Sequence, residues 1–468
     1  MKSFPRYLII LGAIGLLAGM PAVSWSGEGG LSADNIESFR TALDIDARGR
    51  VVFNAVTNND INKLALNREL INQHNDHFNH KLDVGGITDQ KSSGRCWLFA
   101  SLNVLRPIVM KKHDLKDFEF SQNYLAFWDK LEKANCFLEY MIVFRDRDPL
   151  DRELQLYLES PFGDGGYWSY AQALIAKYGA VPKEIMPETN SSGKTGTMNR
   201  VISRRLRQGA AVLRRMHSEG QSVTALRGEK EKILGEIYGM LAVNLGEPPT
   251  EFRWRYEASD STISTEKRYT PQSFYKEFVG VDLAEYVTIF NNPLKPYEKH
   301  YSCALSRDMY DGEDFHYVNM EMSVLKELAL KALLAGEVVT FSCDVGKDQD
   351  RKRGIMAMEI FDYGALFDSD LDMTKEDRAR YFESSSNHMM ALIGVDTADG
   401  RAVKWLVENS WGDDDGAKGY WTMYDDWFDM YVYDVVIRRE HVPERILKVF
   451  EEEPVILPAW DPMSRMIR

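Results

Sequence analysis

The sequence predicts an α+β protein in which a mainly helical part is followed by a part built around an antiparallel sheet. Segments with helical spacing of apolar residues fill the chain to about residue 245, among them the aromatic-rich run from Phe118 to Phe144. The last third holds short strand-like runs, HMMALIGVD, AVKWLVENSW and GYWTMYDDWF, with Asp-Gly turns between them. A chain of 468 residues has room for roughly two to three domains.

The first 26 residues have the layout of a secretory signal peptide. Lys2 and Arg6 precede an apolar run from Tyr7 to Met20, and the small residues Ser24 and Ser26 offer cleavage sites. An uncleaved anchor is the alternative, but the run is short for a membrane span, which takes about 20 residues. We therefore expect an exported protein, periplasmic or secreted, without stable membrane association after cleavage.

The elements that follow are predicted in the order helices, then strands. Ser32 is expected to cap a helix over LSADNIESFRTALDI, and INKLALNRELINQHNDHF continues in a helical pattern. The Gly-rich turn SPFGDGG leads into a helix that ends at Gly179, and charged helical patterns run from 198 to 245. Short aromatic and β-branched runs such as EYVTIF follow, and ELALKALLAGEVVTFSCDV combines a helix with a strand.

The composition argues against several classes of function. The formal net charge is −14 and there is no basic stripe, so we expect no nucleic-acid partner. The chain has four cysteines and no CxxC metal pattern, and Cys136 and Cys343 fall in apolar patterns typical of the core. His74, His77 and His80 recur every third residue, but no carboxylate or cysteine cluster completes a ligand set. We expect no metal and no cofactor.

One cysteine stands in a more reactive setting. The stretch DQKSSGRCWLFAS, residues 89–101, places Cys96 behind a turn of small residues and at the start of an apolar helical pattern. A thiol at a helix N-terminus meets unpaired N–H groups and the positive end of the macrodipole, which favour the thiolate. Cys96 is therefore a candidate nucleophile, with a buried core thiol or half of a disulfide as the alternatives.

Three further residues fit the needs of a thiolate nucleophile, which requires a base and a group that orients the base. His388, in SSNHMMALIGVD, is the candidate base, and Asn409, in VENSWGDDD, is the candidate orienter. Two neighbouring strands of one sheet would bring them together, and Trp411 would shield their hydrogen bond from water. Gln90 would donate its side-chain amide to the substrate carbonyl beside the Cys96 backbone N–H.

These motifs resemble papain-like cysteine peptidases. The likeness rests on Q-x5-C-W, on a His before an apolar strand and on NSWG-x6-GYW. The chain departs from papain at Ser93-Gly94-Arg95-Cys96-Trp97 and at Gly163-Asp164-Gly165-Gly166-Tyr167, where both half-cystines of the family disulfide are missing, and a long Cys-to-His gap implies a large insertion. Within that family the chain resembles the bleomycin hydrolase and bacterial aminopeptidase C branch, in blocks such as KSSGRCWLFASLNVLRP, SCDVGKDQDRKRGIMAMEIFDY and VILPAWDPM.

The resemblance implies a two-half, papain-like fold with helical insertions and a cysteine aminopeptidase activity on peptides. By resemblance, Cys96 is the nucleophile, His388 the general base and then acid, Asn409 the orienter and Gln90 the oxyanion donor. The positions expected along the substrate are Gly165, Gly166, Trp411 and Arg468.

Two properties of the family concern assembly and the chain end. Family members form hexamers whose active sites face an inner cavity, so a homohexamer is expected. Their C-terminal carboxylate pairs with the substrate amine, which turns an endopeptidase groove into an aminopeptidase. This chain ends in WDPMSRMIR, and the side chain of Arg468 would repel that ammonium, so either Arg468 is trimmed or the substrate preference differs.

The resemblance divides the chain into six segments. They are a signal peptide (1–26), an N-terminal helical arm (27–80), the helical half of the catalytic domain (81–195), a mostly helical insertion involved in oligomerisation (196–325), the β-rich half (326–445) and a tail that reaches the cleft (446–468). Two other functions are alternatives: an endopeptidase or amide hydrolase with an altered tail, and a non-enzymatic caged binding protein.

Overall fold

The computed structural model describes residues 29–43 and 45–463, so the predicted signal peptide and Arg468 lie outside the described residues. No helix in this described part is both long enough and apolar enough to cross a membrane. Contacts between residues divide the chain after Leu64 into two compact units. The second unit carries all the elements that position the predicted site residues.

The first unit consists of helices that contribute no core. Helix α1 (Ala33–Ala42) begins after Ser32, whose hydroxyl accepts a hydrogen bond from the backbone N–H of Asn35 at 3.1 Å, as predicted. Helix α2 (Ala47–Asn58) and the short α3 (Ile61–Ala65) follow. Neither α1 nor α2 has a buried residue.

The helical stretch predicted after residue 60 is broken and shorter than expected. The side chain of Asn67 accepts from two backbone N–H groups and starts a new helix, α4 (Arg68–Gln73). The chain is no longer helical after Gln73, and β1 (His80–Lys81) pairs with strand β10. Residues from Ala65 onward belong to the second compact unit, whereas the arm expected from the sequence runs to residue 80.

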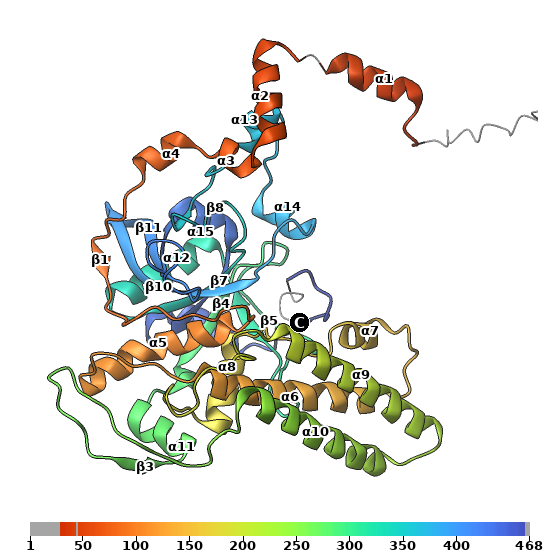
Figure 1. The fold of residues 1–468 in the computed structure, drawn as a ribbon, viewed down its shortest axis with the longest axis vertical. Coiled ribbons are helices and arrows are strands. Elements are labelled where there is room, and N and C mark those ends of the chain that lie inside the picture. The colour runs from red at the N-terminus through yellow and green to blue at the C-terminus, as the bar shows by residue number, and fades with distance from the viewer. Residues whose placement is uncertain (1–28, 44, 464–468) are drawn as a thin grey trace, which may run out of the picture. The chain divides into compact units, whose positions relative to one another are not determined.

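The helical half of the second unit is a group of helices on one side of the sheet (Figure 1). Its helices are α5 (Cys96–His113), α6 (Gln122–Val143), α7 (Arg152–Glu159), α8 (Trp168–Tyr178), α9 (Gly196–Ser218) and α10 (Val223–Leu245). Gly179 ends α8 as predicted, with φ of +73°, and a Cβ there would meet the backbone of Pro271. Only glycine suits both conditions.

The other half is a mixed, mainly antiparallel sheet of 12 strands. The order is β14-β5-β6-β4-β13-β7-β10-β11-β12-β9-β8, with β1 beside β10. Besides β1, the strands are β4 (Tyr286–Phe290), β5 (Lys299–Cys303), β6 (His316–Asn319), β7 (Val339–Cys343), β8 (Gln349–Asp350), β9 (Ile355–Met356), β10 (His388–Ala398), β11 (Arg401–Glu408), β12 (Tyr420–Tyr424), β13 (Val432–Arg438) and β14 (Val455–Leu457). The predicted α+β class is confirmed.

Shorter elements complete the second unit. The α-helices are α11 (Pro271–Phe274), α12 (Met322–Leu334), α13 (Tyr363–Phe367), α14 (Lys375–Arg380), α15 (Asp425–Tyr431) and α16 (Glu444–Leu447). A two-stranded sheet is formed by β2 (Phe252–Trp254) and β3 (Lys267–Tyr269). The π- and 3₁₀-helical turns are η1 (Tyr275–Val279), η2 (Leu283–Glu285), η3 (Arg439–His441) and η4 (Lys448–Glu451).

Two predicted element types are wrong. The insertion expected to be mostly helical over 196–325 has its long helices only up to Leu245. After Leu245 it has short helical turns, the start of α12, and strands β4, β5 and β6 of the main sheet, because runs such as EYVTIF are β-branched and aromatic. The strand predicted over GYWTMYDDWF stops at Tyr424, where helix α15 begins. Asp425 and Asp426 lie in the first turn of that helix, where carboxylates favour the positive end of the dipole.

A buried ion pair joins the two halves of the second unit. Arg106 on α5 contacts Glu408, the last residue of β11, at 2.7 Å, and both side chains are almost fully buried. Asn103, one helical turn earlier, donates to the same carboxylate at 2.9 Å. Because helix α5 starts at Cys96 and β11 ends next to Asn409, this pair fixes the position of two predicted site residues relative to each other.

Candidate active site

The predicted site residues come together at one pocket of about 190 Å³ between the helical half and the sheet. Gln90, Cys96, Gly165, Gly166 and His388 all line it. Asn409 lies behind the imidazole, in hydrogen-bond contact with it, and Trp411 packs on the same ring. Arg468 lies outside the described residues.

Cys96 is the first residue of helix α5, as the sequence predicts. Its sulfur accepts hydrogen bonds from the backbone N–H groups of Trp97 and Met389, so the start of β10 touches the thiol directly. The expected shift toward thiolate is wrong for the closed pocket: burial raises the pKa of Cys96 to about 11, and these hydrogen bonds only partly oppose it.

His388 is the first residue of β10, which lies between β7 and β11 in the sheet. Its Nε2 is 2.8 Å from Oδ1 of Asn409, just beyond the end of β11. The same oxygen accepts from the backbone N–H of Ser410 at 2.8 Å, which fixes the amide so that its oxygen faces the ring. Nε2 therefore carries the proton, and Nδ1 keeps a lone pair that can accept the thiol proton.

The surroundings keep the imidazole uncharged. Burial lowers the pKa of His388 to about 4, and the Asn409 hydrogen bond only partly opposes this shift. Trp411 packs against the ring with centroids 4.9 Å apart, and Arg351 in turn lies 4.6 Å over the Trp411 ring. The Arg351 charge further lowers the pKa of His388.

Gln90 connects the two walls of the pocket. Its Oε1 accepts from the hydroxyl of Ser410 at 2.7 Å, and its Nε2 donates to the carbonyl of Ser93 at 2.5 Å. Its backbone N–H donates to the carbonyl of Ser410 at 2.8 Å. Since a side-chain amide has two N–H bonds, one remains to point at a bound carbonyl oxygen.

The Gly165–Gly166 segment forms the edge of the pocket next to the nucleophile. A Cβ on Gly166 would lie 2.5 Å from the ring of Trp97, so the backbone rests directly on the indole of the residue after Cys96. A glycine is therefore required where the chain passes closest to the nucleophile. Gly165 and Gly166 both line the pocket, and the carbonyl of Gly165 accepts a hydrogen bond from Lys133.

Asp164 holds this segment in place. Its carboxylate accepts from the backbone N–H of Gly94 at 2.9 Å, from Lys130 Nζ at 2.5 Å and from Asn199 Nδ2 at 2.7 Å. Its carbonyl accepts from the indole N–H of Trp97 at 2.7 Å. The Lys130 charge and these hydrogen bonds hold the pKa of Asp164 below its usual range although burial opposes them. Asp164 thus ties the turn before Cys96 to helices α6 and α9.

Sequence reasoning quoted Asp164 but assigned it no role, and it missed Lys130 and Ser410. Lys130 lies among other charged residues, Asp129, Glu132 and Lys133, so nothing in the sequence distinguishes it as a buried lysine. For Ser410 the position beside Asn409 was the only clue. Its contact with Gln90 spans 320 positions of sequence and has no local pattern.

One cluster among the described residues has a spacing that suits a metal ion. It consists of Glu337, Glu440 and His441, none of which lines the pocket. Arg438 already contacts Glu337 at 2.9 Å, so a cation occupies part of that cluster.

The arrangement is suited to nucleophilic attack on a carbonyl. Burial opposes a charge on Cys96 or on His388 alone, yet transfer of the proton from sulfur to Nδ1 creates both charges side by side, where each stabilises the other. Gln90 and Cys96, whose N–H groups are the oxyanion donors expected from the sequence, both line the pocket.

Comparison with known proteins gives a consistent result. Residues 30–464 match the model of the Peptidase C1-like family. The chain is 39% identical over 441 residues to Aminopeptidase C of Lactobacillus delbrueckii subsp. lactis, covering 93% of this chain and 98% of that protein. It is 37% identical over 439 residues to Aminopeptidase C of Streptococcus thermophilus, with 93% and 99% covered. The crystal structure of PepW from Lactobacillus rhamnosis matches with a TM-score of 0.91 at 39% identity, covering 93% and 99%.

Proposed function

The chain belongs to the Peptidase C1-like family and is a cysteine aminopeptidase, and we propose that it cleaves through a thioester on Cys96 with His388, Asn409 and Gln90 as its catalytic partners. The single observation that carries this assignment is the pair of contacts at the start of β10. The N–H of Met389 reaches the sulfur of Cys96, and the Nε2 of His388 is fixed by Asn409 at 2.8 Å.

The reaction follows from these positions. Nδ1 of His388 takes the proton of Cys96, and the thiolate attacks the first peptide carbonyl of the substrate. The oxyanion of the tetrahedral intermediate accepts from the Cys96 backbone N–H and from Gln90 Nε2. The imidazolium gives its proton to the leaving amine, which departs and leaves the thioester. His388 then takes a proton from water as the water attacks the thioester carbonyl. The tetrahedral intermediate collapses with cleavage of the C–S bond, the carboxylic acid of the cleaved residue leaves, and the imidazolium returns its proton to the sulfur of Cys96.

The test compares a free-amine peptide with its N-acetylated twin, under reducing conditions, by mass spectrometry. We expect residues to be lost one at a time from the free peptide only, and iodoacetamide to label Cys96 and to stop the reaction. Internal cleavage of both peptides would contradict the aminopeptidase assignment. Labelling at another cysteine together with loss of activity would contradict the choice of nucleophile.

Two further proposals concern assembly, which the resemblance to the bleomycin hydrolase branch implies, and export, which the N-terminal sequence pattern implies. We infer a homohexamer, which size-exclusion chromatography with light scattering would report as six times the mass of one chain; a stable monomer would contradict it. We also infer export with removal of the first 26 residues, because this segment has the charge and apolar pattern of a signal peptide. Fractionation of cells and N-terminal sequencing of the mature protein test this second proposal.

A further inference from the structure

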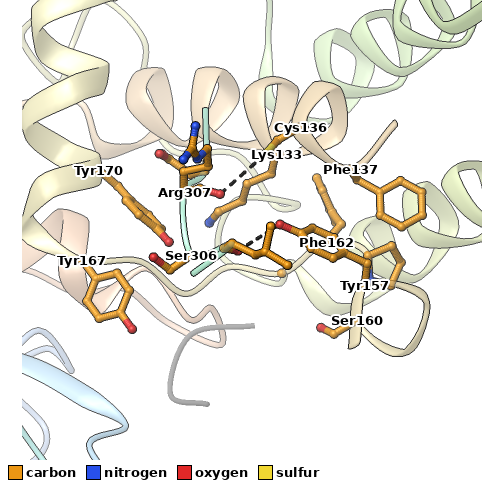
Figure 2. Close-up of a pocket in the computed structure, with 14 residues that line it drawn as sticks. Lys133, Cys136, Phe137, Tyr157, Ser160, Phe162, Tyr167, Tyr170, Ser306 and Arg307 are labelled. Atoms are coloured by element: carbon orange, nitrogen blue, oxygen red, sulfur yellow. Dashed lines mark hydrogen bonds between the residues drawn. The ribbon is translucent and has the colours of Figure 1, made fainter. Parts of the chain in front are cut away.

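A second pocket borders the Gly-rich segment at Gly163 and Tyr167. It is lined by helix α6, by residues 160–163, and by residues 305–308, and it shares Tyr167 with the active-site pocket. Its enclosed volume of about 60 Å³ suits a small polar group. Aromatic side chains of Tyr157, Phe162, Tyr167 and Tyr170 surround it (Figure 2).

The two cationic side chains at this pocket already have acidic partners. Lys133, which extends from helix α6 toward the pocket in Figure 2, contacts Asp129 at 2.8 Å and donates to the carbonyl of Gly165. Arg307 is paired with Asp314 through two hydrogen bonds of 3.0 Å. Each cation thus has an acidic partner, and the charge of Lys133 also acts on the remaining carboxylate of the pocket, Asp308, whose pKa it lowers.

Asp308 is a carboxylate of this pocket that takes part in neither of these two ion pairs. It lines the pocket, it is 4% exposed, and no donor among the described residues reaches its Oδ2. Burying a carboxylate without a partner is costly, so such a group is unusual unless a ligand completes it. Burial, together with the nearby carboxylate of Asp129, raises the pKa of Asp308 to about 7. Burial thus disfavours the ionised carboxylate, and a cation entering the pocket would stabilise that ionised form and lower the pKa again.

We propose that this pocket binds the charged end of a lysine or arginine side chain at the N-terminus of a peptide substrate, with Asp308 as its anionic partner. The inference rests on the proposed aminopeptidase function and adds a specificity subsite to it. An aminopeptidase holds one residue on the amino side of the bond that Cys96 attacks, and Gly165 forms the edge next to that residue. In this arrangement the side chain of that residue extends toward Asp308 by way of Tyr167, which lines both pockets.

The rest of the pocket fits a long cationic side chain. Aromatic rings cover the methylene groups of a lysine or arginine, and their faces attract its charge. Lys133 lies 5.4 Å over the Trp97 ring and is held by Asp129 and Gly165, so it is drawn toward the nucleophile side. An acidic N-terminal residue would meet Asp308 as a like charge and would be excluded.

The experiment measures kcat/KM for two tripeptides, Lys-Ala-Ala and norleucine-Ala-Ala, which differ only in the terminal ammonium of the first side chain. For the wild type we expect the lysine peptide to exceed the norleucine peptide about tenfold or more, as for a polar group with a dedicated buried partner. Asp308→Asn should bring this ratio to about one while the norleucine peptide stays within about threefold of wild type. The thermal midpoint of Asp308→Asn checks its fold.

The matched control is Asp311→Asn, which makes the same chemical change at an exposed carboxylate paired with Lys177 at 2.9 Å, and which should keep the wild-type ratio. A wild-type ratio near one overturns the inference without any variant. So does an unchanged ratio in Asp308→Asn, or an equal loss of both peptides. Cleavage of the norleucine peptide that iodoacetamide abolishes tests the proposed function separately, so the two failures can be told apart.

Discussion

The two walls of the active-site pocket are held by different kinds of interaction. On the nucleophile side, charged groups fix irregular backbone: Asp164 is bound by the buried Lys130, and Arg95 pairs with Glu188 at 2.7 Å. On the base side, the position of His388 is fixed by regular strands and by a neutral amide. A turn lacks the ladder of hydrogen bonds that a strand provides, so it needs strong local contacts. A carboxylate beside the imidazole, in contrast, would raise the pKa of His388.

The largest effect is expected at the thiol, where both walls meet. Cys96→Ala should lower kcat by a factor of about 10⁴ or more, because no other group can form the thioester. Peptide hydrolysis followed by mass spectrometry measures the loss. Cys303→Ala changes a buried cysteine of strand β5 and should retain activity. Substantial turnover by Cys96→Ala would show that the nucleophile lies elsewhere.

Removal of the base should be nearly as damaging. His388→Ala is expected to reduce kcat by about 10³-fold, because the thiol then loses its proton acceptor and the leaving amine its proton donor. Assays above pH 9 should recover part of the activity, since the thiol ionises without a base as the pH approaches its raised pKa of about 11. Wild-type rates at neutral pH would rule out His388 as the base.

The difference between the two walls is tested most directly by changing, on each wall, one residue that fixes its position. Asn409→Ala should lower kcat by about 10- to 100-fold while the thermal midpoint changes little, because the amide orients the ring without balancing a charge. Activity equal to wild type would mean that the sheet alone orients His388. Glu440→Gln, a surface change outside the pocket, serves as a control for handling of the variants.

On the nucleophile side of the pocket, the loss of stability should be large and the loss of activity small, the reverse of what is expected for Asn409→Ala. Asp164→Asn leaves Lys130 buried without its anion, which should cost about 3 kcal/mol of stability. The loss in kcat should be only about tenfold, because the Cys96 thiol and its base remain in place. Urea denaturation and steady-state kinetics report the two quantities. If Asp164→Asn loses activity without losing stability, the distinction between the walls is wrong.

The smallest effect concerns the pH dependence of stability. The folded-state pKa of His388 is lowered to about 4, so the unfolded chain binds the proton more tightly and this contribution to stability is lost as the pH falls from about 6.5 to 4. The full contribution is at most about 3 kcal/mol. The difference between the wild-type and His388→Gln unfolding curves should therefore shrink over this range. A constant difference would mean that His388 is not buried as a neutral ring.

Local sequence patterns were sufficient for part of the fold and for the chemistry of the site. The glycine at the end of α8 follows from capping rules, which act within one turn, and the turn of small residues before Cys96 indicated the start of α5, although Arg95 makes no side-chain cap hydrogen bond there. The Asp164–Lys130 contact has no such rule, because its partners lie on separate elements. The prediction of a thiolate at Cys96 failed for a related reason. The sequence indicated the helix N-terminus, which lowers the pKa of the thiol, but the burial that raises this pKa depends on how β10 packs against α5.

The long-range contact between Gln90 and Ser410 has a consequence for the synthesis of the protein. The nucleophile leaves the ribosome roughly 290 residues before the base, and the group that locks both walls together follows later still. At about 5–20 residues per second, this interval lasts about 15–60 s. The growing chain therefore contains Cys96 without its base for most of the time of translation. The protein can cleave peptides only after the last strands have joined the sheet.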